Sequence, residues 1–258
     1  MKNKKRLLID IGNSAVKAAS GSFQGNKISF IYGEAYNKDK FEKQFNSFIK
    51  KLKNGFPGNS FEFTGISSLN VRQNSFIRKT ISNYFDTKPV FIDLKLKLPL
   101  KIDYADTLGN DRICSAVAAN DKFPGKNILV IDFGTATTFT LVSNGILKGG
   151  IISPGILTAL NSLTEKASLI KTDPQFPKAL INNTTEANIN AGVLYQTLYF
   201  CERVISETTK KYRGLKVIAA GGFSGLISGK TKLIDVTDKE LVFKGINLIL
   251  QRNETDNK

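Results

Sequence analysis

Two stretches of the chain, residues 6–14 and 128–136, share one pattern of apolar and polar positions. Each runs through leucine, isoleucine or valine into an aspartate, which is followed by one apolar residue and a glycine. An apolar run with β-branched residues that stops at Asp-x-Gly predicts a buried strand entering a tight turn. One such segment would be ordinary. Its return at half the chain length predicts two related lobes joined in one chain.

The first lobe is expected over residues 1–121. Its clearest helical pattern covers 38–53, where Phe41, Phe45, Phe48, Ile49 and Leu52 fall on one face at helical spacing. These residues are expected to form core. Further strands are predicted at 15–23, 27–36, 60–66 and 89–94, and further helices at 71–85 and 110–120.

The second lobe, expected over residues 122–258, repeats this plan. After the strand at 127–132, Asn144-Gly145 predicts a two-residue turn between strands at 137–142 and 146–152. Pro154 is expected inside the first turn of a helix, where proline is tolerated. The remaining elements are predicted as helices at 154–166, 185–212 and 241–250, a loop at 169–183, and a strand at 216–220 before a Gly221-Gly222 turn. The fold class is therefore α/β, with a mixed sheet flanked by helices in each lobe.

Composition narrows the class of protein. The chain has 258 residues, of which 41% are hydrophobic, which is enough for two lobes with their own cores. Charged residues interrupt the apolar runs before they reach the roughly 20 residues that a membrane span needs. Asp10 also cuts short the only apolar run near the start, so no signal peptide and a cytoplasmic location are expected. Cys114 and Cys201 lie in helical patterns without metal-ligand spacing and are expected to be buried.

The net charge and the absence of histidine limit the possible partners and catalytic groups. The formal charge of +15 comes from scattered lysines, many near helix ends, without a basic run interleaved with aromatic residues. We therefore expect a surface that attracts small anions, and no nucleic-acid partner. The chain contains no histidine, which excludes Ser-His-Asp and Cys-His catalysis. A proton acceptor in this protein is expected to be a carboxylate.

The two Asp-x-Gly turns suit phosphate binding. Glycine lets the backbone approach a bulky anion, while an aspartate and the hydroxyls of Ser14 and Thr135 can hold a metal ion and phosphate oxygens. Two such turns would grip a nucleotide from both sides.

Five short motifs, in this order along the chain, carry a resemblance to a known family. Residues 10–17, 108–112, 132–137, 149–155 and 220–222 read DIGNSAVK, LGNDR, DFGTAT, GGIISPG and AGG. In order and spacing they resemble type III pantothenate kinases, and the resemblance spans essentially the whole chain. These enzymes are similar to actin, hexokinase and Hsp70. The resemblance implies two duplicated actin-like (ribonuclease H-like) lobes with an ATP cleft between them.

The same resemblance implies transfer of the ATP γ-phosphoryl group to the primary hydroxyl of pantothenate, the first step toward coenzyme A. Asp111 matches the family's catalytic aspartate, although a carboxylate in the first turn of a helix can also serve only to stabilise the helix start. Arg112 matches the residue that pairs with the pantothenate carboxylate. Further substrate contacts are implied at Gly109, Asn110 and Thr185, the last of which could also be only a helix cap. Family members usually carry tyrosine where this chain has Ile102, so either Tyr104 takes over that contact or the contact is absent.

For ATP, the resemblance implies binding by the first motif and by the second Asp-x-Gly turn. Asp10 is expected to face the phosphates and a Mg²⁺ ion, and Asp132 to bind a monovalent cation, potassium or ammonium. Lys17 is predicted either to reach a phosphate or to lie exposed on a strand. The family also implies a homodimer that contacts through the helix at 185–212. The expected ATP contacts are Asp10, Ile11, Gly12, Asn13, Ser14, Ala15, Val16, Lys17 and Thr135.

Two other functions stay open from the residues. Fold does not fix function, so a kinase of another small hydroxylated substrate, such as a sugar, could use the same scaffold. A non-catalytic regulatory relative or an actin-like filament protein would share the nucleotide turns. Residues 109–112 and 149–155 argue against the sugar kinase, and the retention of Asp111, Arg112 and Asp132 argues for a working site.

Overall fold

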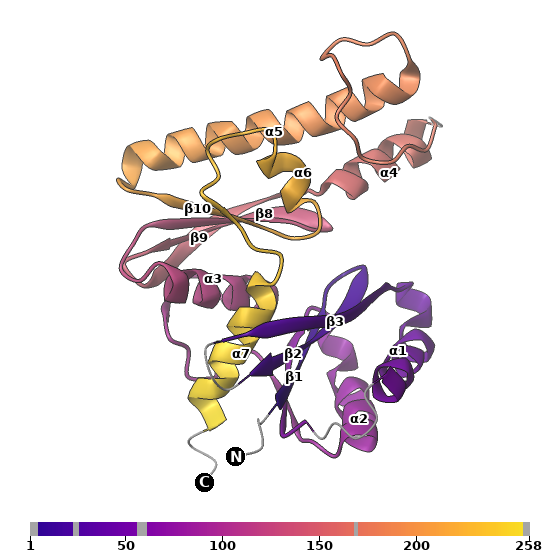
Figure 1. Ribbon diagram of the computed structural model, residues 1–258, viewed down its shortest axis with the longest axis vertical. Helices are drawn as coiled ribbons and strands as arrows, with labels where there is room; N and C mark the ends of the chain where they lie inside the picture. Colours follow the sequence, from indigo (N-terminus) through magenta and orange to yellow (C-terminus); the bar gives the residue numbers. More distant parts are fainter. Residues whose placement is uncertain (1–4, 23–25, 56–60, 168–169, 255–258) are drawn as a thin grey trace. The chain divides into compact units, whose positions relative to one another are not determined.

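The computed structural model describes residues 5–22, 26–55, 61–167 and 170–254. Contacts within the chain divide it into two compact units. One contains residues 1–118 together with 240–258, and the other contains residues 119–239. Each unit is built on its own mixed sheet (Figure 1).

The first unit begins with an antiparallel meander that continues into parallel strands. The strands lie in the order β3-β2-β1-β4-β5. β1 pairs antiparallel with β2 and parallel with β4, so it lies at the centre of the sheet. The strands are β1 Lys5–Ile11, β2 Ala15–Ser22, β3 Ile28–Ala35, β4 Phe63–Ser68 and β5 Pro89–Phe91.

Two helices cover one face of this sheet. α1 (Phe41–Gly55) follows the short 3-10 helix η1 (Lys38–Lys40), and α2 (Asn74–Phe85) follows η2 (Val71–Gln73). The predicted stripe on α1 is buried, and it packs with alternate residues of β1. This confirms that the stripe is core. Members of this cluster from β1, α1 and α2 include Leu7, Ile9, Ile11, Phe41, Phe45, Phe48, Ile49, Leu52, Ile77 and Ile81.

The C-terminal helix α7 (Leu241–Glu254) also belongs to the first unit, where it contacts β1, β2 and β4. A Cβ atom at Gly65 of β4 would lie 2.5 Å from Leu250 Cδ1, so the helix lies directly on the sheet. Buried Arg6 donates through Nε and Nη2 to Glu254 at 2.7 and 2.6 Å. The compact units therefore differ from the predicted boundary, which placed all of 122–258 in the second lobe.

α3 (Asn110–Lys122) packs closely against α7 (Figure 1). A Cβ atom at Gly245 would lie 1.9 Å from the backbone oxygen of Cys114, so only glycine fits there. The first half of α3 is therefore packed closely on α7.

The second unit repeats the sheet of the first. Five of the six strands of its sheet lie in the order β9-β8-β7-β10-β11, with β7 antiparallel to β8 and parallel to β10. This is the order of the first sheet, strand for strand, and it confirms the duplication that the repeated motif predicted. The strands are β7 Ile128–Phe133, β8 Ala136–Ser143, β9 Ile146–Pro154, β10 Lys216–Ala220 and β11 Val236–Thr237.

Three helices flank the second sheet: α4 Ile156–Ala167, α5 Thr185–Lys211 and α6 Ser224–Ser228 (Figure 1). The predicted turn between β8 and β9 is confirmed, since Asn144 and Gly145 both have positive φ angles, 49° and 71°. Pro154 was predicted inside a helix, which is wrong: it ends β9, opposite Ala136 of β8. Both cysteines are buried as predicted.

The part of the chain that the structure describes contains no helix that is long and apolar enough to cross a membrane.

Candidate active site

The first Asp-x-Gly turn is the connection between β1 and β2. Asp10 lies opposite Lys17 of β2 and opposite Ser67 of β4, so side chains from three strands meet at this point of the sheet. The turn is closed by Gly12, whose N–H donates to the backbone oxygen of Ala15 at 3.0 Å. Beyond Asp10, residues 13 and 14 are exposed at the tip of the turn.

Burial perturbs the ionisation of Asp10. Burial raises the pKa of its carboxyl from 3.8 to about 6, Lys17 and Ser67 lower that pKa, and the charge of Asp111 raises it. Asp10 Oδ1 and Ser67 Oγ are both buried, and neither forms a hydrogen bond of normal geometry with a described residue. A buried acceptor without a donor is costly. The pair therefore fits a cation or a donor supplied by a ligand.

Asp111 lies at the start of α3. Asn110 Nδ2 donates to the backbone oxygen of Ser68 at 3.1 Å, which ties the helix start to the end of β4. The backbone N–H of Arg112 donates to Asp111 Oδ1 at 2.8 Å. Burial raises the pKa of the Asp111 carboxyl, and the bond from Arg112 and its charge oppose this rise. A Cβ atom at Gly109 would lie 2.6 Å from Asp111 Oδ1, so glycine at 109 leaves room for the carboxylate.

Arg112 is 6% exposed and packs against Tyr104. Its Cζ atom lies 5.1 Å from the ring centroid, and Nη1 donates to the Tyr104 hydroxyl at 3.4 Å. Ile102, in the two-residue strand β6 (Lys101–Ile102), lies half-buried in the wall of the same pocket as Tyr104. The structure therefore brings Tyr104 to the arginine. This pocket, of about 370 Å³, is lined by Leu94, Leu96, Leu98, Leu100, Ile102, Tyr104 and Asp106.

The second Asp-x-Gly turn is supported by glycines from distant motifs. A Cβ atom at Gly155 would lie 2.2 Å from the backbone oxygen of Gly134 and 2.5 Å from that of Thr135. At Gly221, where φ is +86°, a Cβ atom would lie 2.6 Å from Asp132 Oδ1. Close packing on residues 132–135 thus explains one glycine of each motif, Gly155 and Gly221.

Two hydrogen bonds to the backbone of Thr135 also support this turn. Thr158 Oγ1 donates to the backbone oxygen of Thr135 at 2.6 Å, and the N–H of Gly155 donates to the same oxygen at 3.1 Å. The Thr135 side chain itself is exposed at the tip.

Thr185 is the first residue of α5 and is exposed. The helix cap is its neighbour Thr184, whose hydroxyl accepts from the N–H of Ala187 at 3.3 Å. Thr185 is thus not needed as a cap, which leaves its side chain free for a substrate contact.

Sequence reasoning did not identify three residues beside Asp10. Ser67 follows only from the register of β1 and β4. Tyr36 donates its hydroxyl to the backbone oxygen of Gly12 at 2.6 Å, and burial, followed by the charge of Asp10, raises its pKa. Cys114 was identified only as a buried residue. Burial first, and then the charges of Asp10 and Asp111, hold its pKa well above the ordinary value, so the thiol is neutral.

Two mixed sheets that share the order of five strands, each with an acidic turn after its central strand, give this protein an actin- and hexokinase-like fold. Solved structures show the same fold. An inorganic polyphosphate/ATP-glucomannokinase from Arthrobacter sp. strain KM matches with a TM-score of 0.54 at 12% identity, over 96% of this chain and 99% of that one. A Campylobacter jejuni protein assigned to the Baf family of transcriptional activators matches with a TM-score of 0.62 at 20% identity, over 98% and 100%.

Sequence comparison identifies the family. The family model for type III pantothenate kinase matches residues 6–207. A type III pantothenate kinase of Brevibacillus brevis is 32% identical over 96% of this chain and 99% of its own length. One from Listeria monocytogenes serotype 4a is 35% identical over 66% of this chain and 68% of its own. The chain belongs to the type III pantothenate kinase family. It uses ATP to phosphorylate pantothenate in coenzyme A synthesis, as the resemblance of its motifs implied.

Proposed function

We propose that Asp111 is the catalytic base of pantothenate phosphorylation and that the turn after β1 holds the phosphates of ATP. The observation that carries this proposal is the placement of Asp111. Asp111 lies in the first turn of a helix that a hydrogen bond ties to the end of β4, and its charge raises the pKa of Asp10 at the turn after β1. A carboxylate beside a phosphate-binding turn is the arrangement that alcohol phosphorylation requires.

In the reaction the primary hydroxyl of pantothenate attacks the γ-phosphorus of ATP. The new bond joins the pantothenate oxygen to phosphorus, the bond from phosphorus to the β-phosphate oxygen breaks, and ADP leaves. The hydroxyl proton passes to the Asp111 carboxylate. In a loose transition state this transfer comes late, so Asp111 mainly orients the hydroxyl. Its raised pKa makes it a stronger base than an exposed aspartate.

Arg112 is assigned to the pantothenate carboxylate, since a guanidinium can bind a carboxylate with two parallel hydrogen bonds. Because its neighbour in sequence is Asp111, the two residues would set the distance between the carboxylate and the reacting hydroxyl. Tyr104 is assigned the contact that Ile102 cannot make. Its hydroxyl already lies 3.4 Å from Arg112 Nη1. Gly109, Asn110 and Thr185 remain assigned to the acceptor site.

A Mg²⁺ ion is assigned to Asp10. The residues fit, because Asp10 Oδ1 is a buried carboxylate oxygen without a partner among the described residues and Ser67 Oγ beside it is in the same state. No group of three or more metal-binding side chains occurs within the described ranges. Mg²⁺ usually binds one or two carboxylates, several waters and substrate phosphates. When bound, the ion neutralises charge on the phosphates.

A monovalent cation, potassium or ammonium, is assigned to Asp132, and an ATP contact to Thr135. The support is that Gly134 and Gly221 keep side chains away from the Asp132 carboxylate. The hydroxyl of Thr135 lies at the exposed tip of the same turn, where a phosphate oxygen could reach it.

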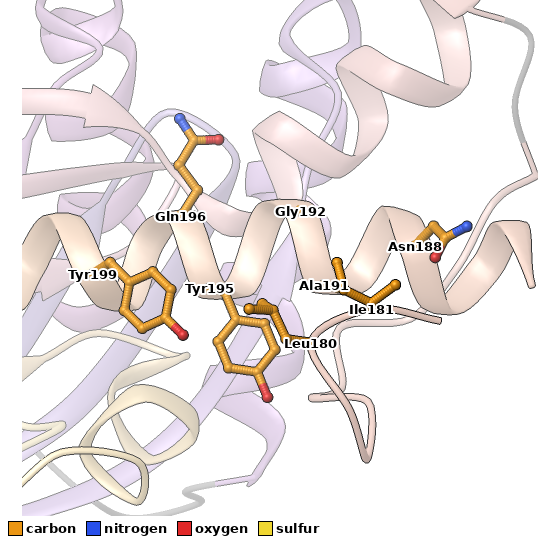
Figure 2. Close-up of a pocket in the computed structure, with 8 residues that line it drawn as sticks. All are labelled: Leu180, Ile181, Asn188, Ala191, Gly192, Tyr195, Gln196 and Tyr199. Atoms are coloured by element: carbon orange, nitrogen blue, oxygen red, sulfur yellow. The ribbon is translucent and has the colours of Figure 1, made fainter. Parts of the chain in front are cut away.

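A homodimer is proposed through α5. An open groove of about 480 Å³ lies along this helix, between it and the preceding loop. Figure 2 shows Tyr195 and Tyr199 on the side of the helix that also faces Leu180 and Ile181. Ile181 is 85% exposed and Tyr199 51%. Apolar surface of this kind is typical of an interface between subunits.

The cytoplasmic location remains a prediction.

The test compares acceptors at a fixed concentration of ATP and Mg²⁺. ADP release should depend on pantothenate and should not rise when glucose replaces it. Asp111→Asn should fold and bind pantothenate but lose turnover by about 10²- to 10⁴-fold. Release that follows glucose would overturn the acceptor assignment, and a near-native rate of the Asn variant would remove Asp111 from the mechanism.

A further inference from the structure

The turn that follows β1 is held from one side by Tyr36, the residue immediately after β3. Tyr36 makes two hydrogen bonds to the turn. Its N–H donates to the backbone oxygen of Ser14 at 3.1 Å, and its hydroxyl donates to the backbone oxygen of Gly12 at 2.6 Å. The whole tip of the turn, from 12 to 14, thus lies between two bonds from one side chain and its backbone.

The position of Tyr36 is itself fixed. Ala35 pairs with Ala15, so Tyr36 continues the register of β3 past the start of β2. Its ring packs edge-to-face on Phe41 at the start of α1, with ring centroids 4.9 Å apart. Contacts outside the turn therefore hold Tyr36 in place.

The bond to Gly12 also sets the direction of the next N–H group. In a planar trans peptide the C=O and N–H point in opposite directions. When the oxygen of Gly12 is held toward Tyr36, the N–H of Asn13 is directed away from Tyr36. A flipped peptide would instead present a carbonyl oxygen where an N–H had been, and a carbonyl repels a phosphate oxygen.

We propose that Tyr36 is a positioning residue that fixes the Gly12–Asn13 peptide in the orientation that binds the phosphates of ATP. This inference rests on the proposed role of the turn as the phosphate site. Tyr36 acts through the backbone of Gly12 and Asn13. Loss of its hydroxyl should therefore weaken the binding of ATP and leave the binding of pantothenate unchanged.

Tyr36→Phe removes only the hydroxyl and keeps the ring on Phe41. A lost hydrogen bond of ordinary strength corresponds to a change of about 2- to 12-fold in affinity. The KM for ATP should rise by that factor, while the KM for pantothenate stays within experimental error. Binding of adenosine, which has no phosphate, should also stay unchanged.

Tyr32→Phe is the matched control. Tyr32 belongs to β3, the strand that precedes Tyr36. It stacks on Phe48 of α1 and donates its hydroxyl to Glu34, away from the turn. This variant should keep the wild-type KM for ATP. Wild-type midpoints of thermal unfolding in both variants would show that neither change loosens the fold.

The outcomes separate the two proposals. A wild-type enzyme that releases no pantothenate-dependent ADP and binds no ATP would overturn the proposed function, whatever Tyr36 does. If the wild type is active, a Tyr36→Phe variant with unchanged KM for ATP overturns the positioning role. An equal rise in both KM values, or equal weakening of ATP and adenosine, would show a merely structural role and overturn it as well.

Discussion

Asp10→Asn should stabilise the ligand-free protein while impairing its activity. The carboxyl of Asp10 has a pKa of about 6 in the folded protein against an ordinary value of 3.8, and burial is the largest cause. Because the folded pKa is the higher of the two, the folded state binds the proton more tightly than the unfolded state does. Stability from this group is therefore present below about pH 4 and is lost as the pH rises through about 6.

The size of the loss follows from the shift. A difference of about two pKa units corresponds to about 3 kcal/mol, which is an upper limit because local relaxation around the charge reduces it. At pH 7.5, without Mg²⁺ or nucleotide, Asp10→Asn should raise the free energy of unfolding by up to about 3 kcal/mol. Asparagine keeps the shape of the side chain without the charge.

Urea unfolding of wild type and variant in EDTA, at several pH values from 4 to 8, measures this difference. The gap between the two proteins should close toward pH 4, where wild-type Asp10 is protonated. Asp173→Asn, the same change at an exposed loop carboxylate, controls for the substitution itself. Mg²⁺ and ATP together should then stabilise the wild type more than Asp10→Asn, because only the wild type offers a carboxylate to the ion.

A variant that is no more stable than wild type at pH 7.5 would refute this reasoning. A difference in the free energy of unfolding that stays constant with pH would also refute it, because such a difference would come from packing and not from charge. The charge of Asp111 also bears on Asp10, so the midpoint of the pH dependence belongs to the pair.

Four further predictions concern other parts of the site and fold. Replacing potassium by sodium should lower turnover if Asp132 binds the cation, and unchanged activity in steady-state assays would speak against that assignment. Gly155→Ala should lower the free energy of unfolding in urea by several kcal/mol, since its Cβ would lie 2.2 Å from a backbone oxygen. Gly225→Ala should leave that free energy nearly unchanged, because a Cβ there would meet nothing within 4 Å. Equal stabilities of the two variants would contradict the packing argument. Tyr104→Phe should raise the KM for pantothenate a few-fold without changing that for ATP, and an unchanged KM would leave the acceptor contact without a residue. Light scattering should give twice the chain mass for the wild type, and a monomer would refute the dimer. Ile181→Asp should shift the protein toward monomer. Val71→Asp, a change at another exposed apolar residue, should not.

Sequence patterns predicted the elements whose signal is local. The strands β1 and β7 were predicted within one residue or two, because a continuous apolar run ending in Asp-x-Gly has few other solutions. The turn at Asn144-Gly145 was predicted because both residues tolerate positive φ. The five-residue helix α6 and the two-residue strand β11 were not predicted, since segments this short carry no periodicity.

What could not be predicted depends on contacts between distant residues. Pro154 satisfies the local rule for a helix start, yet pairing with Ala136 extends β9 to include it. The C-terminal helix α7 follows the second lobe in sequence, yet Arg6 and Glu254, 248 positions apart, bind it to the first unit. Among the site residues, Asp10 and Asp111 were found by motif. Ser67 and Tyr36 could be found only from strand register and side-chain packing.

The two Asp-x-Gly turns are equivalent in topology but are supported in different ways. The second turn is packed by the backbones of Gly155 and Gly221, where any side chain would collide. At the first turn a Cβ atom at Gly12 would come no closer than 3.6 Å to the backbone oxygen of Ala15, and hydrogen bonds from Tyr36 hold the tip. Close packing leaves a turn almost no alternative conformation, whereas a turn held by two hydrogen bonds opens more often. We therefore expect the first turn to fluctuate more than the second around the conformation that Tyr36 holds. Amide exchange at Asn13 and Ser14 should then slow more on nucleotide binding than exchange at Thr135.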